Sequence, residues 1–191
     1  MMLKKIISGG QTGADQAGLF VAKKFGLQTG GTLPCGCRTL DGPRRDLLEL
    51  YGMVEHKSDS YVPRTIQNVK EADGTIRLAA DFGSPGEICT LKAREKYKKP
   101  YFDVDLTDPP NPQEAADWIN ANQIVTLNVA GNAERTFRGC FFRSQSFLTQ
   151  LFFTLGLEMT ISASEILKAL GLEKQKITTM DGILIEQMKI H

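Results

Sequence analysis

SGGQTGAD, at residues 8–15, follows a short apolar run that includes Ile6 and Ile7 and precedes a segment with helical spacing. The apolar run predicts a strand at residues 3–8. Apolar residues recur every three to four positions over residues 13–25 and predict a helix. A glycine-rich turn between a strand and a helix is typical of a βαβ unit. The stretch therefore favours an α/β fold.

The same order recurs along the chain. Further strands are predicted at residues 28–33, 75–80, 100–105 and 124–129, and further helices at residues 62–72, 87–97, 112–120 and 137–155. This alternation predicts a Rossmann-like, doubly wound, mostly parallel sheet with helices on both faces. Residues 34–60 are rich in Gly, Pro, Arg and Asp, and they are expected to form a long functional loop.

The length of 191 residues, with 41% hydrophobic content, is enough for one sizeable core. After Gly156 the alternation of strands and helices stops. We therefore expect a Rossmann-like ligand-binding domain at residues 1–155 and a C-terminal appendage at residues 156–191. A helix is predicted in the appendage at residues 163–170.

Charge and composition limit the kinds of molecule that the protein is expected to bind. Lys and Arg total 23 against 22 for Asp and Glu, so a net charge of +1 provides no broad attraction for nucleic acid or membranes. No stretch approaches the roughly 20 apolar residues that span a bilayer, and the first apolar run is too short for a signal peptide. The cysteines are too few and too unevenly spread for a disulfide framework. A cytoplasmic protein with a small-molecule partner is expected.

The first loop is suited to an anion. Glycines let the backbone turn tightly and approach a ligand, and the first turn of a helix offers unpaired N–H groups with a partial positive charge. A plain tight turn is the alternative, but the polar residues inside the loop favour ligand binding. The loop matches neither the Walker A pattern nor Gly-x-Gly-x-x-Gly. The candidate ligand-binding residues are Gly9, Gly10, Gln11, Thr12, Gly13 and Asp15.

Asp15 is not expected to touch an anion, because like charges repel. It could accept a hydrogen bond from a sugar or base, orient Thr12, or favour the start of the helix.

Two more loops follow predicted strands. In GSPGEICT, residues 83–90, the candidate ligand-binding residues are Ser84, Gly86, Glu87 and Thr90; the alternative is a Pro-Gly turn with Glu87 as an ordinary first-turn acid. Two such loops can face each other at the switch point of an open sheet. In NVAGN, residues 128–132, Asn128 and Gly131 could meet a base, although Asn also caps helices.

The predicted long loop contains PCGCRTLDG, residues 34–42, in which the planar fork of Arg38 could clamp an anion. Its Cys-x-Cys pair is a poor metal site because zinc needs four ligands, and His56 and His191 show no matching spacing. No metal site is predicted. Histidine-based nucleophilic catalysis is not indicated either.

Four segments resemble the putative molybdenum carrier family: IISGGQTGAD at residues 6–15, residues 34–42, residues 68–75 and LNVAG at residues 127–131. The likeness runs in collinear order over roughly residues 3–155. It implies a circularly permuted Rossmann-like fold related to the lysine decarboxylase-like, or cytokinin-activating, proteins. It also implies a homo-oligomer, a dimer or tetramer, that carries molybdenum cofactor, which is a pterin with a phosphate tail and an oxyanionic metal group.

The resemblance implies ligand contacts from the first loop and from Ser84 and Gly86 in the second. The second loop departs from the family pattern, in which a Gly-Thr pair and a nearby Thr are usual. Here Gly86-Glu87 precedes Thr90. A carboxylate at a phosphate site disfavours an anion.

The sequence favours a noncatalytic binding or carrier protein over an enzyme. The ligand would be small, anionic and phosphate-bearing, either nucleotide-like or molybdenum cofactor-like, and no other cofactor is predicted. One alternative is a nucleoside monophosphate N-glycoside hydrolase, the reaction of the enzymatic relatives. Carboxylate catalysis is open through Asp15, Asp41 or Glu87, and no catalytic residue is assigned. Another alternative is a nucleotide-ligand sensor that signals through residues after Gly156.

Overall fold

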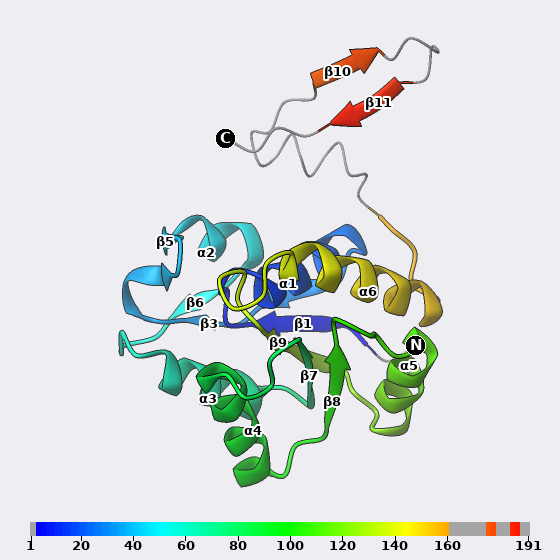
Figure 1. Ribbon diagram of the computed structural model, residues 1–191. Coiled ribbons are helices and arrows are strands. Elements are labelled where there is room, and N and C mark those ends of the chain that lie inside the picture. Colours follow the sequence, from blue (N-terminus) through cyan, green and yellow to red (C-terminus); the bar gives the residue numbers. More distant parts are fainter. Residues whose placement is uncertain (1–2, 161–174, 179–183, 188–191) are drawn as a thin grey trace.

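Five parallel strands form the central sheet of the computed structural model, which describes residues 3–160, 175–178 and 184–187 (Figure 1). The strands are β1 Lys5–Ser8, β2 Gln28–Gly30, β7 Gly74–Ala79, β8 Tyr101–Asp105 and β9 Thr126–Gly131. Their order across the sheet is β2-β1-β9-β7-β8. The predicted α/β, Rossmann-like sheet is confirmed.

The strand order shows a circular permutation. Strand β9 comes last of the five in the chain, yet it lies in the middle of the sheet, where Leu127 pairs with Ile6 of β1 and Val129 pairs with Ile76 of β7. When β9 is counted first, the order becomes 3-2-1-4-5, which is that of a doubly wound Rossmann sheet. The point where the strand order reverses therefore lies between β9 and β7.

Helices cover both faces of the sheet, as predicted (Figure 1). Helices α1 Ala14–Lys24 and α6 Cys140–Thr154 pack together on one face, and α5 Pro112–Ala121 packs against α6. Helices α3 Tyr61–Glu71 and α4 Pro85–Tyr97 pack together on the other. Ser60 caps α3 by accepting a hydrogen bond from the backbone N–H of Val62, and Pro85 opens α4 with its φ already suited to a helix.

The two faces of the sheet differ in polarity. Side chains alternate along each strand, and the set that faces α1 and α6 is apolar and fully buried: Ile6, Ile76, Leu78, Leu127 and Val129. The opposite set, beneath α3 and α4, includes the polar residues Thr75, Arg77, Asp103 and Asn128. Parallel sheets covered on both faces are normally apolar throughout. This polar row is therefore a departure from core packing.

The single strand predicted at residues 28–33 is two strands. Gly31 has a φ of +114°, and a Cβ there would lie 2.1 Å from the carbonyl oxygen of Ser8. The chain turns at this glycine, so β2 stays in the central sheet while β3 Thr32–Leu33 pairs in parallel with β6 Val54–Glu55.

The predicted loop at residues 34–60 contains regular structure. It includes the short turn η1 Cys35–Cys37, the antiparallel pair of β4 Arg38–Thr39 and β5 Gly42–Pro43, and helix α2 Asp46–Tyr51. These elements enclose a second, smaller core made of Leu19, Leu33, Cys37, Leu47, Tyr51 and Met53.

Beyond residue 160, β10 Gln175–Thr178 and β11 Leu184–Gln187 form an antiparallel pair. The helix predicted at residues 163–170 lies outside the described residues. Within the described ranges, no helix combines the length and hydropathy needed to cross a bilayer.

Candidate functional site

The three predicted loops meet at the edge of the sheet where β1, β7 and β9 have their carboxyl ends. Asn132, just after β9, joins them. Its Oδ1 accepts hydrogen bonds from the backbone N–H groups of Ala80 and Asp81, both at 2.9 Å, and its carbonyl oxygen accepts one from Ala14 at 3.1 Å. Open α/β sheets bind their ligands at this edge, next to the point where the strand order reverses. We call this region, with residues 8–15, Arg64 and Glu87, the edge site.

Arg64 reaches the first loop from helix α3. Its guanidinium lies over Gly9 so closely that a Cβ on the glycine would fall 1.4 Å from Nη1. With Arg64 in this orientation, the space beside position 9 is filled, and a larger residue there would displace the guanidinium. Nη1 lies 3.5 Å from Oδ2 of Asp15, whereas Nε is buried and has no hydrogen-bond partner.

Asp15 holds the first loop in place. Its side chain is buried in the first turn of α1, where Oδ2 accepts a hydrogen bond of 3.1 Å from the backbone N–H of Gln11. Burial raises the pKa of Asp15, and the charge of Arg64 acts in the opposite direction. The carboxyl group is thus engaged with the loop backbone and with Arg64.

Glu87 lies in the first turn of α4 and is also buried. Its Oε2 has no hydrogen-bond partner, and Nη1 of Arg77 lies 3.8 Å away. Burial raises the pKa of Glu87 to about 7, against the lowering effect of Arg77; the carboxyl groups of Asp15, Asp103 and Asp81 also raise it. Near neutral pH, a large fraction of Glu87 therefore carries no charge.

Arg77 belongs to the polar row beneath α3 and α4. It forms a bidentate ion pair with Asp103 of the neighbouring strand, with Nε–Oδ1 at 2.7 Å and Nη2–Oδ2 at 2.5 Å. The guanidinium also lies 5.1 Å from the ring centre of Phe82 and 5.4 Å from that of Tyr101. These contacts hold the arginine side chain in one orientation.

Two hydroxyl groups near the first loop are also without a partner. The Oγ of Ser8 and the Oγ1 of Thr12 are buried and have no hydrogen-bond partner, like Nε of Arg64. Most buried polar atoms in proteins are hydrogen-bonded, so three such atoms around one loop call for an explanation. The hydroxyls and the guanidinium N–H can all donate, which suits the oxygens of an oxyanion.

Three glycines of the predicted site contact the protein itself. A Cβ on Gly10 would lie 2.6 Å from Cδ2 of Leu33, one on Gly13 would lie 2.4 Å from the carbonyl oxygen of Asn132, and one on Gly131 would lie 2.0 Å from that of Leu78. Gly10, Gly13 and Gly131 thus let neighbouring segments approach closely.

The second loop is more open. A Cβ on Gly86 would meet nothing within 4 Å, and the side chain of Ser84 makes no capping hydrogen bond at the start of α4. Thr90 is buried and donates a hydrogen bond of 3.0 Å to the carbonyl oxygen of Gly86. Gly86 and Ser84 are therefore accessible from outside the protein, whereas the Thr90 hydroxyl is engaged with the helix.

Asn128 and Arg38 lie apart from these groups. Asn128 is buried within β9, where its Nδ2 donates to Oγ1 of Thr75 at 3.2 Å. The exposed side chain of Arg38 pairs with Asp59 at 3.5 Å. Residues 34–42 do reach the first loop through Gln11, whose Oε1 accepts a hydrogen bond of 2.8 Å from the backbone N–H of Leu40.

The sequence prediction missed Arg64 and Arg77. Each carried a signal. Arg64 stands in the first turn of a helix, where a cation opposes the helix dipole. Arg77 stands within the fully buried strand β7, where a charged residue needs a specific partner.

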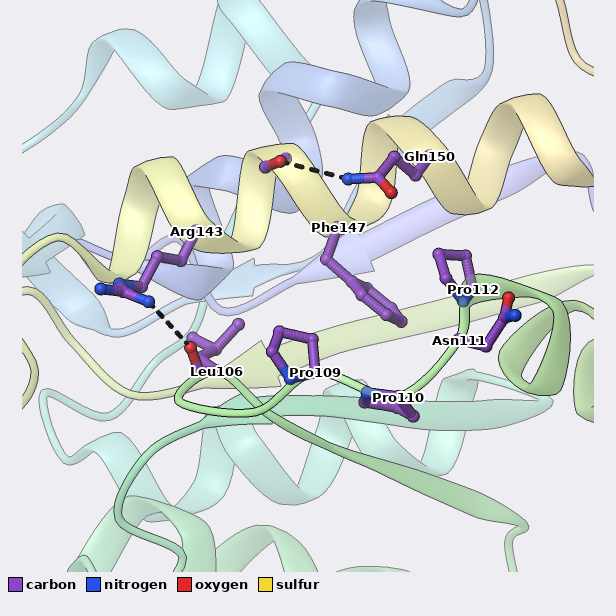
Figure 2. Close-up of a pocket in the computed structure, with 9 residues that line it drawn as sticks. Leu106, Pro109, Pro110, Asn111, Pro112, Arg143, Phe147 and Gln150 are labelled. Atoms are coloured by element: carbon purple, nitrogen blue, oxygen red, sulfur yellow. Dashed lines mark hydrogen bonds between the residues drawn. The ribbon is translucent and has the colours of Figure 1, made fainter.

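A groove of about 640 Å³ lies elsewhere, between α6 and the connection from β8 to α5. Figure 2 shows Phe147 of α6 pointing toward the segment from Pro109 to Pro112, and Arg143 and Gln150 also line the groove. Nη1 of Arg143 donates a hydrogen bond of 3.2 Å to the carbonyl oxygen of Leu106 across one end of this groove. None of the site residues predicted from the sequence lines it.

The fold and the edge site together define a circularly permuted Rossmann-like protein with a buried cluster of arginines and carboxyl groups at the ligand-binding edge of its sheet. Residues 6–152 match the model of the circularly permutated YpsA SLOG family, and the chain belongs to that family. The crystal structure of a putative molybdenum carrier protein from Syntrophus aciditrophicus SB has the same fold, with a TM-score of 0.72 and 32% sequence identity. The match covers 78% of this chain and 94% of that one, and it confirms the predicted resemblance. No curated protein matches the chain.

Proposed function

We propose that this protein binds a small anionic ligand at the edge site, with the loop after β1 and Arg64 holding the anion. The observation that carries the proposal is the position of Arg64. Its guanidinium lies over Gly9, and its Nε is buried without a partner. Leaving a buried donor unsatisfied costs about 1–3 kcal/mol, which a bound oxyanion would offset.

The other groups of the edge site favour the same ligand class. The start of α1 offers the positive end of the helix dipole, while the backbone N–H groups of Gln11, Thr12 and Ala14 already donate within the protein. The hydroxyls of Ser8 and Thr12 add two donors. In the described part of the chain, no group of three or more His, Cys, Asp or Glu residues could hold a metal ion. A metal-containing ligand would therefore be held through its own oxygens.

We further propose that the ligand is phosphate-bearing, either nucleotide-like or molybdenum cofactor-like, and that the protein carries it without transforming it. The crystal structure named as a putative molybdenum carrier protein supports this choice. The division into a ligand-binding domain at residues 1–155 and an appendage at residues 156–191 is part of the proposal. It is supported by a family match that ends at residue 152. The homo-oligomer and the cytoplasmic location stay predictions.

The ligand itself can be identified by native purification, release with acid, mass spectrometry and elemental analysis for molybdenum. Binding of molybdate, sulfate and AMP should then be measured by calorimetry. Arg64→Gln is expected to weaken binding of each probe that binds by at least about tenfold, because a charge-assisted hydrogen bond is lost. Arg38→Gln is the matched control and should leave affinity unchanged. Equal effects of the two variants would contradict the proposed site.

One observation favours a second function, an N-glycoside hydrolase acting on nucleoside monophosphates. Glu87 is a buried carboxyl group whose pKa is raised to about 7, which suits a general acid at neutral pH. Glu87 would donate a proton to the leaving base as its bond to the ribose carbon breaks. Water would add to that carbon and give its proton to the Glu87 carboxylate, leaving free base and ribose phosphate.

Release of free base from a panel of nucleoside monophosphates tests this second function. Glu87→Gln should abolish release if Glu87 is the acid. No release by the wild-type protein would exclude the hydrolase and leave the carrier.

A further inference from the structure

We propose that Asp103 is a positioning residue of the edge site. By holding Arg77 in a bidentate ion pair, it lets Glu87 remain uncharged and donate a hydrogen bond to the bound anion. This inference rests on the proposed function, because Glu87 belongs to the same site.

The geometry of Arg77 is the first argument. Two of its nitrogens are used by Asp103, and the aromatic rings of Phe82 and Tyr101 lie against the guanidinium. The remaining nitrogen, Nη1, donates a hydrogen bond of 3.4 Å to the backbone carbonyl of Glu87. Nη1 is 3.8 Å from the carboxyl oxygen Oε2 of Glu87, which is too far for a hydrogen bond. Arg77 therefore lies beside the carboxyl group of Glu87 but forms its ion pair with Asp103.

The charges around Glu87 are the second argument. The cation that faces it is Arg77, while three carboxyl groups face it from other elements: Asp15 on α1, Asp81 after β7 and Asp103 on β8. Arg64, the other arginine of the edge site, pairs with Asp15. Burial and these carboxyl groups outweigh Arg77, so the pKa of Glu87 is raised. Asp103 raises the pKa of Glu87 in two ways, because it adds negative charge nearby and neutralises the charge of Arg77.

The unpartnered oxygen is the third argument. Glu87 exposes only 2% of its surface, and its Oε2 makes no hydrogen bond within the protein. An ionised carboxylate here would repel an oxyanion, whereas the protonated form is a donor. An ionised glutamate would be out of place at an anion site. Asp103 thereby converts this acidic side chain into a group that can hold the anion.

The experiment follows the ionisation of Glu87 directly. The carboxyl carbons of glutamate are labelled with ¹³C, the Glu87 resonance is assigned with Glu87→Gln, and its titration is recorded by NMR. In Asp103→Asn, the midpoint of Glu87 should fall by about one pH unit or more, because Arg77 is released toward Glu87. Asp105→Asn removes the same charge from the same strand and should leave the midpoint unchanged. Asp103→Glu, which keeps the negative charge, should leave the titration midpoint of Glu87 at its wild-type value.

A binding measurement completes the test. Sulfate is the probe, because its own charge is constant between pH 6 and pH 8. Wild-type affinity for sulfate should fall several-fold over this range, Glu87→Gln should remove that dependence, and Asp103→Asn should move the fall to lower pH. An unchanged Glu87 midpoint in Asp103→Asn would overturn the role of Asp103. A shifted midpoint without sulfate binding at any pH would overturn the anion site and, with it, the donor role.

Discussion

Arg64 and Gly9 form a pair in which the helix α3 side chain occupies the space that any side chain at position 9 would need. The contact joins the face of the sheet covered by α3 and α4 to the loop that precedes α1. Neither residue explains the site alone, since the glycine provides the space and the arginine provides the charge.

Gly9→Ala should therefore weaken anion binding by at least about tenfold, because the new methyl group displaces the guanidinium of Arg64. The control is Gly86→Ala in the second loop, where a Cβ has free space. Alanine there should raise the free energy of unfolding by about 0.5–1 kcal/mol, as expected for glycine in a helix. Sulfate titration of both variants by calorimetry checks the prediction, and normal binding by Gly9→Ala would refute it.

The raised pKa of Glu87 predicts a pH dependence of stability. A folded-state pKa of about 7, against an ordinary value of 4.5, means that the folded protein binds this proton more tightly. The stability from this group is complete below about pH 4.5 and declines until about pH 7, a loss on the order of 3 kcal/mol. Urea unfolding between pH 4.5 and pH 8 should show this decline in the wild-type protein, and the decline should be smaller by about that amount in Glu87→Gln. Glu95→Gln, at an exposed position of the same helix, should keep the wild-type slope.

Asn132→Ala should lower the free energy of unfolding by about 2–4 kcal/mol, because three side-chain hydrogen bonds to residues 80 and 81 are lost and their backbone groups are left unsatisfied. Asn122→Ala is the matched control. Its exposed side chain makes one hydrogen bond, to the carbonyl of Trp118, and its loss should cost less than about 1 kcal/mol. Similar midpoints of denaturation for the two variants would contradict a joining role for Asn132.

Asn68 links α3 to β3 through both backbone groups of Thr32, with hydrogen bonds of 2.9 and 3.2 Å. Asn68→Ala should cost about 1–3 kcal/mol of stability and also weaken sulfate binding, since Arg64 lies on the same helix. Asn68→Asp keeps the acceptor but turns a carboxylate oxygen toward the Thr32 carbonyl in a buried position, so it should cost at least as much stability as Asn68→Ala. If Asn68→Ala is destabilised but binds sulfate normally, the helix position does not depend on this link.

Much of the fold was predictable because the signals are local. The helix at α1 and the strand at β7 each show their own periodicity. The split at Gly31 was not predictable, because the positive φ of that glycine comes from its close approach to Ser8. Helix α2 has only six residues, too few for a periodic pattern. The place of β9 between β1 and β7 depends on pairing between distant segments.

Some residues of the candidate site could likewise be named from the sequence, and others could not. Asp15 and Glu87 could be named from the sequence because each follows a glycine-rich turn. Arg64 was missed because an arginine on a helix usually faces solvent, and its place in the first turn of α3 was its one local signal. The partnership of Arg77 with Asp103 requires two strands to lie side by side in a given register, which composition does not reveal.

The central position of β9 has a consequence for the order in which the sheet can assemble during synthesis. Before residues 126–131 leave the ribosome, β1 can pair only with β2, and β7 only with β8. The nascent chain then holds two separate strand pairs, each with an open edge that only β9 will cover. Such edges can pair with other chains, so the interval before β9 emerges is when this protein is most exposed to aggregation.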